Sequence, residues 1–277
     1  MAYEFLKGHG TENDFVLLPD LDGAVHGALD AEQMAQRVRA LCDRRAGIGG
    51  DGVLRVVRST NPDRPDSAEW FMDYRNSDGS FSEMCGNGIR LFVRYLVDHG
   101  LADGSAPIPV DTRDGVKTLT LDGDLITVDL GTPKVLGETT VGAEGITWAA
   151  RHIDVGNPHA VAFVSTLDEP GPLLEPPTHD PAIYPDGVNV EFVVRRGDRH
   201  VAMRVHERGS GETRSCGTGA CAVMVAAAVA DGNRPAGAEV AYRVDVPGGT
   251  LTVTWTADDR VLLTGPAVVV ARGTTDL

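Results

Sequence analysis

The chain has 277 residues and is acidic, with 25 Lys and Arg against 40 Asp and Glu and a formal net charge of −15. Its basic residues are scattered, whereas proteins that neutralise nucleic-acid phosphates or an anionic membrane gather them into a patch. The composition therefore argues against nucleic acid and membrane as partners. The length favours two domains, because one domain holds about 100–200 residues, and 42% hydrophobic residues suffice to bury real cores.

The first residues lack the pattern of a signal peptide, and we expect a cytoplasmic protein. The longest apolar run, residues 220–230, is 11 residues long, and a membrane helix needs about 20. In that compartment Cys42, Cys85, Cys216 and Cys221 are expected to be free thiols. No Cys or His spacing typical of a zinc site occurs, so no metal is expected.

Hydrophobic periodicity and the positions of Gly and Pro predict a sheet-rich chain with three helices. In chain order, strands are expected at residues 15–18, 52–57, 117–121, 125–130, 159–164, 188–194, 201–205, 250–255 and 261–264. Helices are expected at residues 31–43, 89–99 and 220–230, and loops at 60–67 and 168–185. The third helix is apolar on every face, which predicts that protein surrounds it.

An internal repeat connects the two halves of the chain. Cys85 and Cys216 each begin the pattern Cys-Gly-x-Gly ahead of a predicted helix, and a polar residue, Asn76 or Glu207, lies nine residues before each. Further upstream, Asp-Gly-Val at 51–53 matches 186–188, and Asn-Asp-Phe at 13–15 matches Asn-Pro-His at 157–159. The four markers recur in the same order, and the sequence therefore predicts two related domains, the second beginning near residue 122.

A cysteine at a helix start lies near unpaired N–H groups and the positive end of the helix dipole. We expect its pKa to fall toward neutrality, so that it exchanges protons at physiological pH. The N–H groups of Gly86, Asn87, Gly217 and Thr218 would form anion sites that suit an α-carboxylate. Two such cysteines on opposite sides of one substrate are what a stereoinverting proton transfer requires.

Removal of an α-proton from an amino acid usually relies on pyridoxal phosphate, which a lysine holds as a Schiff base. The chain has only Lys7, Lys117 and Lys134, and none lies in a Gly-rich phosphate-binding context. We therefore expect no cofactor. Helix N-termini, exclusion of water and preorganised hydrogen bonds would then stabilise the carbanion.

At these residues the chain resembles the diaminopimelate epimerase family. The matching segments are HGTENDF (9–15), NSDGSFSEMCGNGIR (76–90), GNPHAV (156–161), DGVNVEF (186–192) and ERGSGETRSCGTGACA (207–222). The resemblance implies interconversion of LL- and meso-diaminopimelate in lysine and cell-wall synthesis, without cofactor and with Cys85 and Cys216 as the acid/base pair. It implies substrate contacts from Asn13, Asn76, Gly86, Asn87, Asn157, Asn189, Glu207, Arg208, Gly217 and Thr218, and tuning of the cysteine pKa values by His159 and Glu207.

The family fold is α/β (α+β), with two pseudo-symmetric domains, each a curved, mostly antiparallel sheet wrapped around a central helix. The halves expected here are residues 1–121 with 266–277, and residues 122–265. The sequence does not decide whether the chain forms a homodimer. One position departs from the family: many members carry Gln after the Asp of the segment at 50–52, and that Gln contacts substrate. Gly52 has no side chain, so a neighbour or water would replace the contact.

The same residues allow other interpretations. Cys42 and Cys221 are expected to be packing residues, because cysteine is often buried. Asp51 and Asp186 are expected to cap or turn the backbone, and His159 could simply bond a neighbouring strand. Rival functions are a proline racemase, disfavoured because that family typically has His at the position of Asn87, a thiol redox protein, disfavoured by the lack of CxxC, and a catalytically silent amino-acid binder.

Overall fold

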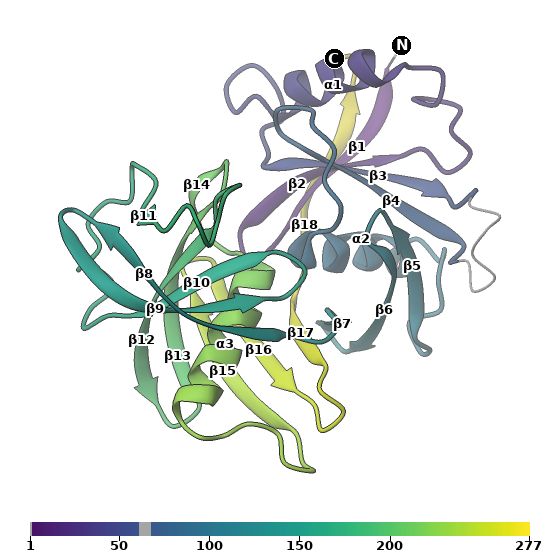
Figure 1. The fold of residues 1–277 in the computed structure, drawn as a ribbon. Helices are drawn as coiled ribbons and strands as arrows, with labels where there is room; N and C mark the ends of the chain where they lie inside the picture. Colours follow the sequence, from purple (N-terminus) through teal and green to yellow (C-terminus); the bar gives the residue numbers. More distant parts are fainter. Residues whose placement is uncertain (1, 61–67) are drawn as a thin grey trace. The chain divides into compact units, whose positions relative to one another are not determined.

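The computed structural model describes residues 2–60 and 68–277. They form two compact units, one containing the residues up to Val128 together with Pro266–Leu277, and the other Asp129–Gly265 (Figure 1). The sequence placed the boundary at residue 121, which is inside a hairpin of two antiparallel strands, and the structure divides the chain after the second of them. Of the loop expected at 60–67, residues 61–67 lie outside the described part of the chain.

The first unit is a sheet in the order β18-β1-β2-β3-β4-β5-β6-β7, in which β2–β3 and β4–β5 are parallel and the other neighbours antiparallel. Its helices are α1 (Ala31–Cys42) and α2 (Gly86–Asp98). The strands are β1 (Tyr3–Gly10), β2 (Asn13–Pro19), β3 (Gly52–Arg58), β4 (Trp70–Asn76), β5 (Ile108–Thr112), β6 (Gly115–Asp122), β7 (Leu125–Asp129) and β18 (Val268–Thr275).

The second unit repeats this order as β8-β9-β10-β12-β13-β15-β16-β17, with β10–β12 and β13–β15 parallel. Its one long helix is α3 (Gly217–Ala230). The strands are β8 (Lys134–Ala143), β9 (Ile146–Asp154), β10 (Pro158–Phe163), β12 (Asn189–Gly197), β13 (His200–Glu207), β15 (Val240–Val246), β16 (Gly249–Trp255) and β17 (Val261–Pro266), with the short β11 (Thr178–His179) and β14 (Gly211–Thr213). The predicted fold class of two mostly antiparallel, related halves is confirmed.

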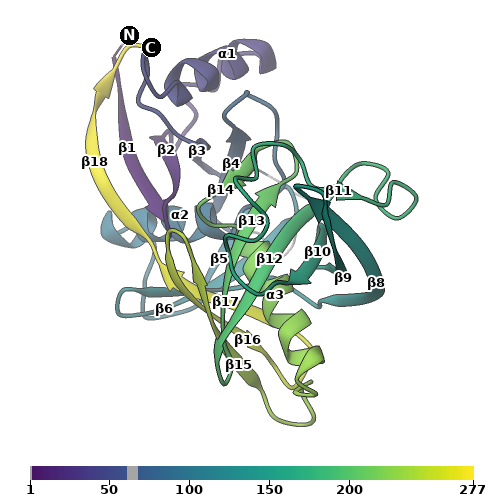
Figure 2. The same ribbon diagram turned by 90° about the vertical axis from the view of Figure 1, so that its left-hand side faces the viewer.

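The parallel strand pairs explain where the helices lie. Parallel neighbours need a crossover connection, and a helix is the usual one. α2 connects β4 to β5, and α3 connects β13 to β15 at the same place in the second sheet. α3 contacts β9, β10, β12, β13, β15 and β16, so the sheet curves around it (Figures 1 and 2).

The predicted burial of the third helix is confirmed. Every residue of α3 from Gly219 to Ala228 is buried, on all faces. The helix begins three residues before the predicted start at 220, because the two glycines after Cys216 belong to its first turn. Among residues 2–60 and 68–277, no helix is both long enough and apolar enough to cross a membrane.

The outer faces of the two sheets are covered differently. In the first unit α1 crosses from β2 to β3 and packs Met34, Val38 and Leu41 on Val16 and Leu18. In the second unit the chain between β10 and β12 is almost entirely loop, as predicted for 168–185, and it packs buried Leu173 and Tyr184 over the sheet. The loop thus replaces a helix, and only β11 within it is regular.

Strand register corrects one part of the predicted repeat. Phe15 pairs with Gly52 in the first sheet, and His159 pairs with Asn189 in the second. The match of Asn13 with Asn157 is therefore consistent with the structure, but Gly52 corresponds to Asn189. The sequence match of 51–53 with 186–188 is wrong by two residues, because a three-residue likeness is too short to fix the register of a strand.

The nine predicted strands are all found, and seven longer strands were missed. Those strands are β1, β4, β5, β8, β9, β15 and β18. In several of them charged or exposed residues interrupt the apolar alternation, as in β4 and β18. These segments become strands because they pair with a neighbouring strand, and the sequence of one segment alone does not show that pairing.

The position of α3 predicts how the second unit responds to loss of core volume. Met224 is fully buried in α3, and Met224→Ala should lower the stability by about 2–5 kcal/mol through the lost transfer energy and the cavity left behind. Urea unfolding followed by circular dichroism measures the change. Val268→Ala, at a position 45% exposed in β18, should change stability by less than about 0.5 kcal/mol; equal losses would contradict the packing described.

Candidate active site

Cys85 and Cys216 are the N-cap residues of α2 and α3. Both have extended backbone, with φ and ψ of −139° and 120° for Cys85 and −118° and 118° for Cys216. Each sulfur accepts a hydrogen bond from the N–H three residues on, at 3.4 Å from Gly88 and 3.3 Å from Gly219. The predicted placement of a cysteine at each helix start is confirmed, and both sulfurs occupy the site where helix N–H groups favour negative charge.

A chain of oriented amides lies beside Cys85. Fully buried Arg90 donates to Oδ1 of Asn87 at 2.9 Å, the Asn87 amide donates to Oδ1 of Asn13 at 3.2 Å, and the Asn13 amide donates to Asp51 at 2.8 Å. A guanidinium only donates and a carboxylate only accepts, so Arg90 at one end and Asp51 at the other fix the orientation of both side-chain amides. The oxygen of Asn13 therefore faces Cys85, whose sulfur lies 3.5 Å away.

Asp51 is thus more than a turn former. It accepts from the Asn13 side chain and from the N–H of Asp14, and pairs with Arg44 at 2.7 Å. Burial, followed by the charge of Asp14, raises the pKa of Asp51. Although burial opposes it, hydrogen bonds and charge from Arg44 and Lys7 hold the pKa of Asp14 well below its usual range. The pair of carboxyls is held by two cations.

Tyr74 occupies the place of the missing side chain at Gly52. A Cβ on Gly52 would lie 2.5 Å from the carbonyl oxygen of Arg75 and 2.8 Å from a ring carbon of Tyr74. The Tyr74 hydroxyl donates to Oδ1 of Asn76 at 3.0 Å, and the Asn76 amide donates to Ser80 at 3.0 Å. The ring of Tyr74 therefore fills the space beside Gly52, and its hydroxyl reaches Asn76.

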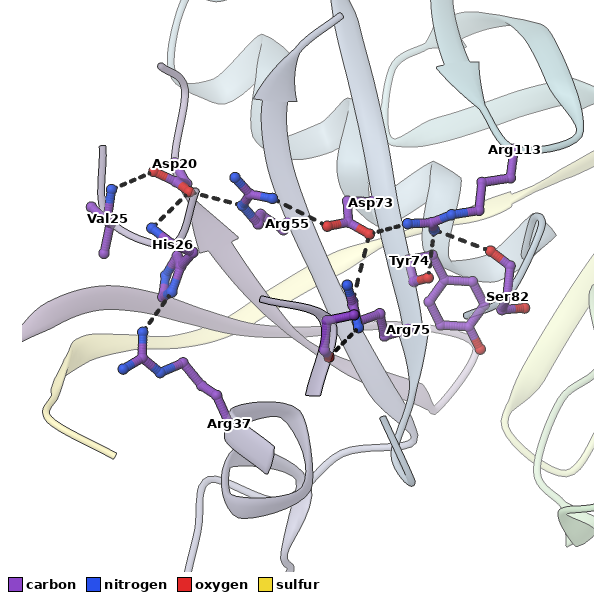
Figure 3. A network of polar contacts seen from close by, with 11 residues as sticks. Asp20, Val25, His26, Arg37, Arg55, Asp73, Tyr74, Arg75, Ser82 and Arg113 are labelled. Atoms are coloured by element: carbon purple, nitrogen blue, oxygen red, sulfur yellow. Dashed lines mark hydrogen bonds and ion pairs between the residues drawn. The ribbon is translucent and has the colours of Figure 1, made fainter. Parts of the chain in front are cut away.

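A polar network braces this part of the first unit (Figure 3). Arg55 bridges Asp20 and Asp73, at 2.8 and 3.3 Å, and Arg113 pairs with the other oxygen of Asp73. Arg113 also donates to the carbonyl oxygens of Tyr74 and Ser82, at 2.8 and 3.3 Å. The segment that leads to Cys85 is thereby tied to β4.

The second unit places a buried acid–base pair near its cysteine. His159 and Glu191 are both fully buried, and Nδ1 of His159 lies 2.6 Å from Oε1 of Glu191. Nε2 of His159 lies 2.9 Å from Oδ1 of Asn157. Burial raises the pKa of Glu191, although the histidine opposes the rise.

The environment of Cys216 contradicts the expected low pKa of this thiol. Burial, and then the nearby carboxyls of Glu207 and Glu191, raise the pKa of Cys216 well above its usual value. Burial also raises the pKa of Glu207, against hydrogen bonds from Thr213 and Cys216. The helix start lowers the cost of a thiolate, but desolvation and two carboxyls outweigh it here.

Asn189 and Arg208 form the remaining part of the second set. The Asn189 amide donates to the carbonyl of Pro158 at 3.2 Å, and its oxygen accepts from the N–H of Arg208 at 2.9 Å. The Arg208 guanidinium donates to the carbonyl of Asp186 at 3.3 Å. Its stem lies against Gly187, where a Cβ would meet it at 3.1 Å.

Most residues singled out from the sequence take part in small hydrogen-bonded groups within each unit. Asn13, Asn87 and Cys85 are linked by hydrogen bonds, as are Asn157 with His159, Glu207 with Cys216, and Cys216 with Thr218 at 3.5 Å. Gly86 and Gly217 are the first residues of their helices. The sequence did not single out Tyr74, Arg90 or Glu191, although Arg90 and Glu191 stand inside quoted segments.

Cys42 and Cys221 are not N-cap residues. Both are buried, Cys42 at the end of α1 and Cys221 within α3. Burial raises the pKa of Cys42 to about 12. Their expected packing role is consistent with these positions.

Comparison with known proteins extends this picture. Residues 5–136 and 151–270 match the family model of diaminopimelate epimerase. A diaminopimelate epimerase of Streptomyces coelicolor is 58% identical, over 98% of this chain and 95% of its own. One from Mycolicibacterium smegmatis is 44% identical, over 98% and 96%.

Solved structures show the same fold at low identity. A phenazine biosynthesis protein of the PhzF family from Bacillus anthracis matches with a TM-score of 0.73 and 15% identity, over all of both chains. A hydroxyproline epimerase from Agrobacterium vitis, solved with trans-4-hydroxy-L-proline, matches with a TM-score of 0.68 and 17% identity, over 99% of this chain and 92% of its own. With the family model and the relatives matching nearly the whole length, this chain belongs to the diaminopimelate epimerase family.

Proposed function

We propose that this chain interconverts LL- and meso-diaminopimelate, as a step of lysine biosynthesis in the cytoplasm, by two-base proton transfer without pyridoxal phosphate. The observation that carries the proposal is the duplicated N-cap cysteine: the two halves present a thiol at the same point of the same topology. The names of relatives at 58% and 44% identity support the substrate.

In the proposed reaction one cysteine acts as thiolate and removes the Cα proton, and the other, as thiol, delivers its proton to the opposite face. The bond to the leaving hydrogen breaks as the new C–H bond forms, so each turnover exchanges the protonation states of the two sulfurs. The substrate α-carboxylate would accept from the N–H groups of Gly86, Asn87, Gly217 and Thr218, which begin their helices and lack intrahelical acceptors.

The second amino-acid end of the substrate needs its own polar partners. We assign these to Asn76, Asn157, Asn189 and Arg208, with Asn13 and Glu207 near the reacting carbon. The guanidinium of Arg208 suits a distal carboxylate because its planar fork can donate two parallel hydrogen bonds. A proline racemase would not need this set, because its substrate has one carboxylate and no second amino-acid end.

The cysteine assignment is tested by exchange of the α-hydrogen in deuterated water, followed by NMR with LL-diaminopimelate and no added cofactor. Cys85→Ala and Cys216→Ala should each lower the exchange rate by about 10²–10⁴-fold or more, because each removes one acid/base group. Full exchange in either variant would rule out the two-base assignment.

Two controls sharpen this experiment. Cys42→Ala and Cys221→Ala remove buried thiols that do not cap a helix start and should keep most of the exchange. Proline offered in place of diaminopimelate should show no exchange. Binding of diaminopimelate without any exchange in the unaltered protein would identify a silent binding module instead.

Tyr74 gives a second test of the substrate set. We infer that its hydroxyl makes the contact that a side chain at position 52 makes in other members, because its ring fills that place and its hydroxyl reaches Asn76. Tyr74→Phe should raise KM for diaminopimelate by about tenfold, the cost of one hydrogen bond, with a smaller effect on kcat.

The matched control is Tyr95→Phe, which removes a hydroxyl from a buried tyrosine of α2 in the same unit. It should leave KM unchanged. An unchanged KM in Tyr74→Phe would show that the hydroxyl does not contact substrate.

A further inference from the structure

The repeated register shows which residues correspond around the two cysteines. Phe15 pairs with Gly52, and His159 pairs with Asn189. Two residues further along these strands stand Leu54 and Glu191. The pair Phe15 and Leu54 in the first unit therefore corresponds to the pair His159 and Glu191 in the second.

Leu54 and Phe15 lie against the first turn of α2, and Glu191 lies against the first turn of α3. A Cβ on Gly88 would lie 3.2 Å from Leu54, 3.4 Å from Phe15 and 3.5 Å from Cβ of Cys85. A Cβ on Gly219 would lie 2.8 Å from Oε1 of Glu191 and 3.2 Å from the Cys216 sulfur. Since this Cβ position is 2.8 Å from Oε1 of Glu191 and 3.2 Å from the Cys216 sulfur, the oxygen and the sulfur are at most 6.0 Å apart.

Burying the pair of His159 and Glu191 costs desolvation free energy. Glu191 is fully buried, and its other oxygen, Oε2, has no hydrogen-bond partner within residues 2–60 and 68–277. Burying a charge costs several kcal/mol, and an apolar pair of similar volume is often as stable or more so. The first unit has such an apolar pair at the same place, so folding alone does not require the acid.

We propose that Glu191 is a positioning residue that makes the two cysteines unequal: held by His159, its carboxylate stands beside Cys216 and keeps that sulfur protonated, whereas Leu54 and Phe15 occupy the matching places beside Cys85. The inference rests on the proposed two-base function and deepens it. Cys216 would then start as the acid, and Cys85 would be the thiol that gives up its proton, the one it donates to Oδ1 of Asn13 in the structure.

Other titratable groups face the same region and bear on the titration of Cys216. Glu207 hydrogen-bonds the sulfur and adds a second carboxyl. Tyr184 is close enough for Glu191 to raise its pKa, to about 12 with burial as the larger cause. His152 stacks edge-on to Tyr184 at 4.6 Å between ring centroids. Because Glu191 raises the pKa of both Tyr184 and Glu207, its removal lowers their pKa values as well, and each variant is therefore compared with a Cys85→Ser/Cys216→Ser reference that carries the same residue 191.

The test is the titration of the Cys216 thiolate by its ultraviolet absorbance in a Cys85→Ser background, with Cys85→Ser/Cys216→Ser subtracted. Glu191→Gln removes a negative charge near the sulfur, and the thiolate then costs less. Its midpoint should fall by about one to two pH units. Glu239→Gln, which removes an exposed carboxylate from the same unit, should leave the midpoint in place.

A double variant guards against misfolding of Glu191→Gln. His159→Phe/Glu191→Leu copies the apolar pair of the first unit and removes both members of the buried His159–Glu191 pair, so that neither is left without the other. It should shift the midpoint in the same direction. An unchanged or raised midpoint in both folded variants would overturn the proposal. The readout needs no substrate, so it is independent of the exchange assay that tests the proposed function.

Discussion

The structure depends on one local arrangement, a cysteine that caps a helix connecting two parallel strands. The crossover requires the helix to pack on its own sheet, and the cap places the sulfur at the helix start with an N–H bonded to it. Because Gly88 and Gly219 carry no side chain, residues of the neighbouring strands pack directly against this turn: Leu54 and Phe15 at Gly88, and Glu191 at Gly219. The fold thereby fixes where the thiol lies before any substrate contact is considered.

Within that common frame the two halves differ in their buried charges. Beside Cys85, Arg90 and Asp51 orient two amides from opposite ends. Beside Cys216, the carboxyls of Glu207 and Glu191 raise the pKa of the thiol, and His159 is hydrogen-bonded to Glu191. A duplicated backbone therefore carries two electrostatic environments, which suits a reaction in which one sulfur begins as acid and the other as base.

Two buried charged residues, Arg90 and Glu191, have partners that explain their place in the interior. An arginine inside α2 and a glutamate inside the second sheet each cost desolvation free energy. Arg90 is bonded to Asn87, a proposed substrate contact, and Glu191 to His159, which is expected to tune the cysteine pKa. Their partners give both residues a positioning role that packing alone does not explain.

The sequence by itself determined the repeat, the two cysteines at helix starts, the apolar α3 and the nine most regular strands, because these depend on local spacing and hydrophobicity. It misplaced the repeat at 51–53 and missed strands such as β4 and β18, since register and pairing are set by residues far along the chain.

Only the tertiary structure decided which groups surround the two thiols. Leu54 and Glu191 look like ordinary strand residues, and their contacts with the helix starts arise only when the sheet folds around α2 or α3. For the same reason the low pKa expected of Cys216 was wrong: the helix start is visible in the sequence, but the burial and carboxyls that oppose it are not.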